Sequence, residues 1–157
     1  NLHKVSKRFL ELSKIYKEEY FIRLCGDSPL ISKAIIDKLI NISKKDKFDL
    51  ITNRYCNYPK GQTVEVIRSK TFGKIHNYFK SKDHFEHVTQ YFYENPKSFN
   101  IKYVHSNKDI HNINFAIDNN EDFKKISRLI KSMNKDHTAY QYNELINLYN
   151  HFEKHNS

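Results

Sequence analysis

Two aspartates, Asp27 and Asp118, are the residues of this sequence best placed to do chemistry. Asp27 follows the apolar segment 20–25 through one glycine, and Asp118 directly follows the apolar segment 114–117. If both segments are central, parallel strands, their carboxyl ends open into one crevice, where α/β sheets bind ligands. Two carboxylates there could hold Mg²⁺ for chemistry on phosphates. Alternatively, each aspartate caps the following helix or belongs to a turn, and for either aspartate alone the pattern favours this alternative.

The elements that must position these aspartates alternate along the chain. Short apolar segments predict strands at residues 20–25, 48–52, 64–67, 101–105 and 113–117. Amphipathic segments predict helices at about residues 5–16, 32–45, 71–79, 83–93, 121–133 and 140–152. This alternation predicts an α/β fold, a three-layer sandwich around a mostly parallel sheet, in a single domain over residues 1–157.

The composition predicts a folded basic chain and excludes several function classes. Aromatic residues make up 14% of the 157 residues, which a disordered chain does not carry. The net charge is +9, but only five of the 27 basic residues are arginines, and the lysines are interleaved with acidic residues. We interpret them as a solvated surface with weak general attraction to anions and no specific nucleic-acid binding. No apolar run approaches the roughly 20 residues of a membrane-spanning helix.

Cysteines and glycines are also informative because they are few. Cys25 and Cys56 are too few for a disulfide framework or a zinc site, so a reducing, cytoplasmic setting is expected. None of the three glycines lies in a G-x-G or P-loop setting, the usual cradle for phosphate groups.

Four segments carry a resemblance to a known family. They are FIRLCGDSPLISKAIIDKLI at 21–40, YPKGQTVEVI at 58–67, FEHVTQYFYENPKSF at 85–99 and NFAIDNNEDFKKISRLI at 114–130. In this order they resemble blocks of the sugar-acid cytidylyltransferases, the CMP-sugar synthetase-like family, and especially its spore-coat polysaccharide biosynthesis branch. No single segment is specific enough, but the ordered set is.

The resemblance implies a fold, a reaction and a cofactor. The fold would be that of the nucleotide-diphospho-sugar transferases, which is Rossmann-like. In the reaction, a hydroxyl of a sugar, typically a 2-keto sugar acid, attacks the α-phosphate of CTP, and pyrophosphate leaves. The CMP-sugar would serve the synthesis of cell-surface polysaccharide or glycoconjugate. Asp27 and Asp118 match the two aspartates with which the family binds Mg²⁺, in agreement with the strand-end argument.

The sequence also departs from the family pattern. Nothing matches the family's first strand and the arginine-containing loop that contacts the nucleotide, so the resemblance predicts that this chain corresponds to the last two-thirds of a member. We therefore expect background turnover by these residues alone and an unpaired strand edge near residues 20–25 or 113–117. Phe85 stands where the family has arginine before E-H-V-T, which leaves the contact of that arginine unassigned.

Six further residues are candidates for binding the substrates, and each has a structural alternative. Arg23 could contact phosphate or reach to solvent from its strand. Glu65 alternates with two valines and could bind sugar hydroxyls or face solvent. Tyr58 and Gln62 lie in a polar loop that could cover the acceptor sugar or form an ordinary turn. Glu86 and His87 could contact a sugar or a carboxylate, or the histidine could instead orient a loop.

Three rival functions remain. A nucleotidyltransferase could use a nucleotide other than CTP, and a non-catalytic interaction domain could keep the same fold. A nucleic-acid-binding module predicts a clustered Lys/Arg face with exposed aromatic rings. A homodimer is possible, but no segment of the sequence specifies one.

Overall fold

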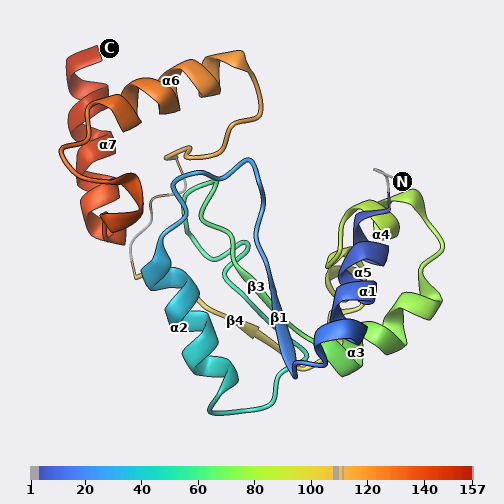
Figure 1. Cartoon of the computed structure of the whole chain (residues 1–157). Helices are drawn as coiled ribbons and strands as arrows, with labels where there is room; N and C mark the ends of the chain where they lie inside the picture. Colours follow the sequence, from blue (N-terminus) through green and yellow to red (C-terminus); the bar gives the residue numbers. More distant parts are fainter. Residues whose placement is uncertain (1–3, 108–109, 111, 157) are drawn as a thin grey trace.

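A four-stranded sheet forms the centre of the computed structural model, which describes residues 4–107, 110 and 112–156 (Figure 1). Its strands lie in the order β1-β3-β2-β4. Their bounds are β1 (Tyr20–Arg23), β2 (Leu50–Thr52), β3 (Glu65–Arg68) and β4 (Ile101–Tyr103). One row of the register runs from Ile22 through Val66 and Ile51 to Lys102.

The sheet is mixed, which corrects the prediction of a mostly parallel sheet. β3 pairs antiparallel with both β1 and β2, and only β2 and β4 pair in parallel. The cause is the connection between β2 and β3. Residues 53–64 contain no crossover helix in the structure, and an antiparallel neighbour needs none.

Seven α-helices and three short 3₁₀ turns are found among the described residues. The helices are α1 (Val5–Tyr16), α2 (Lys33–Ser43), α3 (Ser69–Ile75), α4 (Lys82–Glu86), α5 (Gln90–Glu94), α6 (Asn120–Lys131) and α7 (Tyr142–Asn156). The 3₁₀ turns are His76–Tyr78, Pro96–Ser98 and His137–Ala139. The single helix predicted over 83–93 is therefore two, α4 and α5. The strand predicted at 113–117 is reduced to one bridge between Lys60 and Asn114.

Helices cover both faces of the sheet, so the structure has the predicted three layers. On one face, Ile35 and Leu39 of α2 pack against Ile51 and Val66. On the other face, α1, α3, α4 and α5 enclose a second cluster that includes the side chain of Ile67. Because β2 and β3 are covered on both faces, all side chains of β2 and those of the first three residues of β3 are buried whichever way they point.

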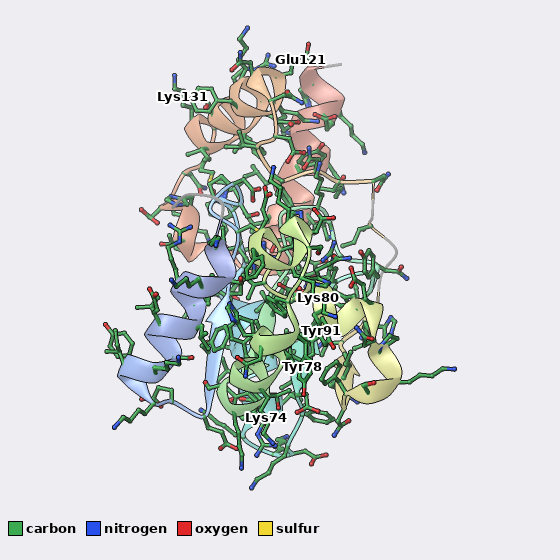
Figure 2. The ribbon with its side chains drawn as sticks, turned by 90° about the vertical axis from the view of Figure 1, so that its right-hand side faces the viewer. Lys74, Tyr78, Lys80, Tyr91, Glu121 and Lys131 are labelled. Carbon is green, nitrogen blue, oxygen red and sulfur yellow. The ribbon has the colours of Figure 1, made fainter. Side chains whose placement is uncertain are left out.

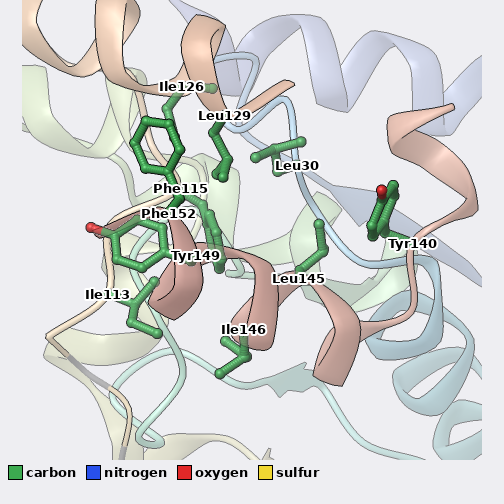
Figure 3. Close-up of a cluster of buried hydrophobic side chains, with 10 residues drawn as sticks. All are labelled: Leu30, Ile113, Phe115, Ile126, Leu129, Tyr140, Leu145, Ile146, Tyr149 and Phe152. Atoms are coloured by element: carbon green, nitrogen blue, oxygen red, sulfur yellow. The ribbon is translucent and has the colours of Figure 1, made fainter. Parts of the chain in front are cut away.

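A third cluster lies beyond the sheet, where α6 and α7 pack together. Figure 3 shows Phe115, Ile126, Leu129 and Tyr149 within it. Phe115 brings the segment that precedes Asp118 into this cluster, and its ring meets that of Tyr149 edge to face, with centroids 5.3 Å apart. The α6–α7 pair thus supports the segment that carries the second aspartate.

β1 forms one edge of the sheet, as expected for residues 20–25. Within the described residues it pairs with β3 alone. A groove of about 270 Å³ runs beside it, lined by Phe9, Leu12 and Tyr16 of α1.

No helix in the described part of the chain is both long and apolar enough to cross a membrane.

Candidate active site

The structure brings the segments of Asp27 and Asp118 together. The backbone N–H of Ile117 donates a 2.9 Å hydrogen bond to the carbonyl of Asp27, so the two aspartates lie on neighbouring backbone segments. Both side chains are exposed. The Ser28 hydroxyl donates to Asp27 Oδ1 at 2.9 Å, which orients that carboxylate.

Neither aspartate caps a helix, which was one of the two structural alternatives, cap or turn, that the sequence pattern favoured for each. Asn119 caps α6, where its Oδ1 accepts from the N–H groups of Glu121 and Asp122 at 2.8 and 3.0 Å. Ser32 occupies the N-cap position of α2, five residues beyond Asp27. Asp27 does lie in a turn, but its carboxylate has no capping role. Neither carboxylate is therefore used to satisfy the N–H groups at a helix N-terminus.

A close backbone contact positions Lys60 beside Asp118. The Lys60 N–H donates to the carbonyl of Ile113 at 3.1 Å, and its carbonyl accepts from Phe115 N–H at 2.9 Å. Gly61 makes this approach possible. It has φ +83°, and a Cβ there would lie 2.6 Å from the backbone of Phe115 and Ala116. Only glycine fits this position without displacing backbone.

Lys60 provides the positive charge next to the two aspartates. Its ammonium group donates to the Asp118 carboxylate. That hydrogen bond raises the pKa of the Lys60 amine above its ordinary value, and the charges of Asp122 and Asp27 act in the same direction. Asp122 also supports the site, because its Oδ2 accepts from the Asp118 N–H at 3.1 Å. The charges of three carboxylates therefore act on one lysine ammonium, which is bonded to Asp118.

Glu65 lies in the interior rather than on the crevice surface, which corrects its prediction as a direct sugar ligand. It is fully buried. Its Oε2 accepts from Arg23 Nη1 at 2.9 Å, and its Oε1 accepts from the Thr89 and Tyr93 hydroxyls at 2.8 and 2.6 Å. Burial, followed by the Glu65 charge, raises the pKa of the Tyr93 phenol. Glu65 therefore positions Arg23 and Tyr93, and Arg23 is held with part of its side chain exposed.

Gln62 is likewise buried and bonded within the protein, so the prediction that it covers a sugar is corrected. Its Oε1 accepts from Ser32 N–H at 2.9 Å, and its Nε2 donates to the Leu30 carbonyl at 2.7 Å. It ties the loop after β2 to the segment after β1. Tyr58 is half-buried, with its ring against Tyr142 and its hydroxyl 3.4 Å from Lys38 Nζ.

Glu86 and His87 stand apart from the paired aspartates. They lie at the end of α4, which packs on α1, and His87 is exposed. Among the described residues, no hydrogen bond or ion pair joins either side chain to Asp27 or Asp118. Thr89, just beyond them, instead reaches Glu65.

Sequence reasoning missed Arg54 and Lys60. Both line a cavity of about 470 Å³ formed by the loop after β2. Arg54 follows the end of β2, so the strand-end rule that selected Asp27 would have selected it too. Lys60 precedes Gly61 in the segment Y-P-K-G. A glycine shortly after a proline is a sequence signal for a tight turn, and this turn places Lys60 in the site.

The rival nucleic-acid interpretation finds little support on the helical face, which is the side of the molecule covered by α1, α3, α4 and α5. Figure 2 shows Lys74, Tyr78, Lys80 and Tyr91 on one side of the molecule. Tyr78 is 61% exposed, but Tyr91 is half-buried and packs on Phe79, with centroids 5.7 Å apart. The Tyr78 ring already stacks on that of Tyr91, with centroids 6.4 Å apart, so these two rings do not form the platform of separate exposed rings on which single-stranded nucleic acid stacks.

A family model for cytidylyltransferases matches residues 1–151. An uncharacterized protein of Methanocaldococcus jannaschii is 34% identical over 129 residues, which cover 81% of this chain and 52% of that protein. A solved cytidylyltransferase from Leptospira borgpetersenii superposes with a TM-score of 0.89 at 21% identity, over 97% of this chain and 64% of that one. The chain thus spans about half the length of the curated relative and under two-thirds of the solved structure.

These comparisons bear on the expectation that only the C-terminal part of a member is present. The family model matches residues 1–151 of this chain, and no comparison gives independent support for a missing first strand and loop. The family match also does not distinguish the sugar-acid or spore-coat branch from the rest of the family.

Proposed function

Because the chain belongs to the cytidylyltransferase family, we propose that it forms part of a CTP-dependent enzyme that transfers CMP to a sugar and releases pyrophosphate. The acceptor would be a 2-keto sugar acid, and the product a CMP-sugar for polysaccharide or glycoconjugate synthesis. The observation that carries the proposal is the meeting of Asp27 with the Asp118 segment through the Ile117 N–H.

Mg²⁺ fits the donors at this position. The described residues contain no group of three or more histidine, cysteine, aspartate or glutamate side chains arranged around one metal position. Mg²⁺ needs no such cage, because it commonly binds one or two carboxylates and completes its shell with water and substrate phosphates. Asp27 and Asp118 would hold it, and it would neutralise charge on the phosphates.

The residues of the chain have distinct parts in this proposal. In the transfer, a bond forms between the sugar hydroxyl oxygen and the α-phosphorus, and the bond from that phosphorus to the pyrophosphate oxygen breaks. Lys60 balances the charge of Asp118 and adds a cation for developing phosphate charge. Arg23, fixed by Glu65, adds another from β1. Catalysis here is positioning and electrostatics rather than covalent chemistry.

Nucleotide binding with and without Mg²⁺ tests the proposal. Calorimetry should show CTP bound more tightly than ATP, GTP or UTP, with an affinity that rises when Mg²⁺ is present. Asp27→Asn and Asp118→Asn should remove the Mg²⁺ dependence. The control Asp37→Asn alters an exposed ion pair on α2 and should leave it intact. Nucleotide binding that ignores both Mg²⁺ and the two aspartates would overturn the proposal.

Turnover tests the substrate class. We propose that the 157 residues by themselves release pyrophosphate only at background rate, because no segment of the sequence matches the arginine-containing loop with which the family contacts the nucleotide. Losing one preorganised donor already costs on the order of 10²–10³ in rate. The measurement is pyrophosphate release from CTP and Mg²⁺ with a panel of 2-keto sugar acids. Robust release would contradict the expected inactivity and would identify the acceptor directly.

A further inference from the structure

Arg54, at the end of β2, is held by two tyrosine rings. Its guanidinium carbon lies 4.8 Å from the ring centroid of Tyr55 and 5.0 Å from that of Tyr93. The two rings meet edge to face, with centroids 5.9 Å apart. Its backbone N–H donates to Thr52 Oγ1 at 3.0 Å. Cation–π contacts of this kind fix the plane of a guanidinium while leaving its N–H groups free to donate.

The interior of the protein fixes one of these rings. The Tyr93 hydroxyl donates to Glu65 Oε1 at 2.6 Å and lies 3.0 Å from Thr52 Oγ1. Glu65 belongs to β3 in the middle of the sheet and is fully buried. The ring that supports Arg54 is therefore anchored to the core, and the guanidinium position is preorganised.

Two arginines near this point differ in their partners. Arg23 is paired with Glu65. Arg54, in contrast, forms no ion pair with any carboxylate of the described residues. A partly buried guanidinium that is oriented but unpaired is suited to a planar oxyanion from outside the chain, because its donors match carboxylate and phosphate oxygens.

The surroundings of Arg54 also favour an anion. Arg54 and Lys60 line the same cavity of about 470 Å³, and none of its lining residues is acidic. Tyr55 and Tyr58 supply aromatic walls to this cavity. Lys60 links it to Asp118, so a ligand that contacts Lys60 in the cavity would lie beside that aspartate.

We propose that Arg54 is a substrate-binding residue that holds an oxyanion in this cavity. The oxyanion is either a nucleotide phosphate or the carboxylate of the acceptor. The proposal rests on the proposed function, which supplies both groups. Tyr93 is its positioning residue, because its ring supports the guanidinium, and Glu65 acts on Arg54 through the Tyr93 hydroxyl.

Direct anion binding tests this proposal without turnover. The probes are inorganic pyrophosphate, N-acetylneuraminate and the uncharged methyl ester of N-acetylneuraminate, each titrated by calorimetry into the purified chain. Arg54→Met should lower the affinity for one anion by about tenfold or more, as expected for the loss of a charge-assisted bidentate contact. A loss for pyrophosphate assigns the phosphate. A loss for N-acetylneuraminate, with the ester bound equally weakly by both proteins, assigns the carboxylate.

Matched variants separate a specific contact from general charge. Arg8→Met removes one exposed positive charge from α1 and should leave both affinities unchanged. Arg54→Lys keeps the charge but loses the fork, so it should bind the same anion several-fold more weakly; it also serves if Arg54→Met does not fold. Equal affinities in all Arg54 variants, equal losses in Arg8→Met, or no anion binding by the unchanged chain would overturn the proposal. If the unchanged chain binds these anions through Arg54 but shows no preference for CTP and no Mg²⁺ dependence, the result counts against the proposed function and not against this proposal.

Discussion

Two carboxylate–cation pairs in this molecule have the same chemistry and opposite surroundings. In the pair of Glu65 with Arg23, the glutamate side chain is 0% exposed, and two hydroxyl groups complete its hydrogen bonds. In the pair of Asp118 with Lys60, the side chains are 44% and 57% exposed. A buried pair cannot be opened without leaving a desolvated charge, whereas an exposed pair can exchange its partner with a ligand at little cost. The buried pair therefore fixes the position of Arg23, whereas the exposed pair can separate when a ligand binds to Asp118 or Lys60.

The largest expected effect comes from opening the buried pair. Glu65→Gln leaves Arg23 without its carboxylate and should lower the free energy of unfolding by about 3 kcal/mol. Asp118→Asn opens the exposed pair and should change it by less than about 1 kcal/mol. Urea unfolding followed by circular dichroism measures both. Similar losses in the two variants would erase the distinction between the pairs.

A smaller loss is expected where the backbone brings the exposed pair together. Gly61→Ala adds a Cβ 2.6 Å from the backbone of Phe115 and Ala116 at a positive φ, and should cost about 1–3 kcal/mol in unfolding free energy. The matched control is Gly73→Ala in α3, where a Cβ meets no atom within 4 Å. That change should stabilise by about 0.5–1 kcal/mol, because alanine favours a helix. A stability equal to that of the unchanged chain in Gly61→Ala would show that the loop can move away.

A pH-dependent effect, smaller again, applies the burial argument to a histidine on the helical face. Burial lowers the pKa of His76 below 6.5, and the charges of Lys14 and Lys7 act in the same direction. As the pH falls through 6.5, the unfolded chain takes up this proton before the folded chain does, so the free energy of unfolding decreases.

The His76 effect is measured by urea unfolding between pH 7.5 and 5. His76→Phe removes the imidazole that titrates, so it should flatten the decrease. The phenylalanine ring can keep the contact with Phe79, which preserves the packing. His137→Gln, which changes a more exposed histidine, should leave the decrease in place. A slope that His76→Phe does not change would assign the pH dependence to other groups.

The smallest stability effect is expected at Lys60. Lys60→Met should change the free energy of unfolding by less than about 1 kcal/mol, because the pair is exposed to solvent. It should nevertheless raise the affinity for Mg²⁺ several-fold, because the metal no longer competes with the ammonium for Asp118. Competition with Mn²⁺, followed by electron paramagnetic resonance, measures this change. Lys38→Met removes an exposed lysine of α2 and should leave metal affinity unaltered.

Local patterns predicted the elements well, and long-range contacts explain where they failed. The apolar spacing of α2, α6 and α7 needs only neighbours in sequence, and the observed bounds of those helices lie within four residues of the predicted ones. The predicted helix over 83–93 is interrupted because Thr89 turns its hydroxyl to Glu65, a contact 24 residues away. Whether two strands pair in parallel or antiparallel depends on which strands become neighbours in the sheet. The spacing of apolar residues along one segment does not specify that neighbour.

The candidate site shows the same division. Asp27 and Asp118 were selected because each follows an apolar segment, and their segments do meet, although residues 113–117 form no strand. Glu65 was expected to face a crevice because it alternates with valines. That inference fails on β3, since a strand covered on both faces has no solvent side.

The short segment 113–117 also bears on how this sequence can drift over evolutionary time. Its main-chain hydrogen bonds connect it to the loop of Lys60 and to the turn of Asp27, while Ile113 and Phe115 are buried in the cluster of α6 and α7. The approach of the two aspartate segments therefore depends on the backbone as well as on these buried side chains. Substitutions in this segment should be limited to apolar residues of similar size at the buried positions, and position 61 should accept glycine alone. Distant relatives of this chain should thus keep an apolar segment before the second aspartate and one glycine beside it.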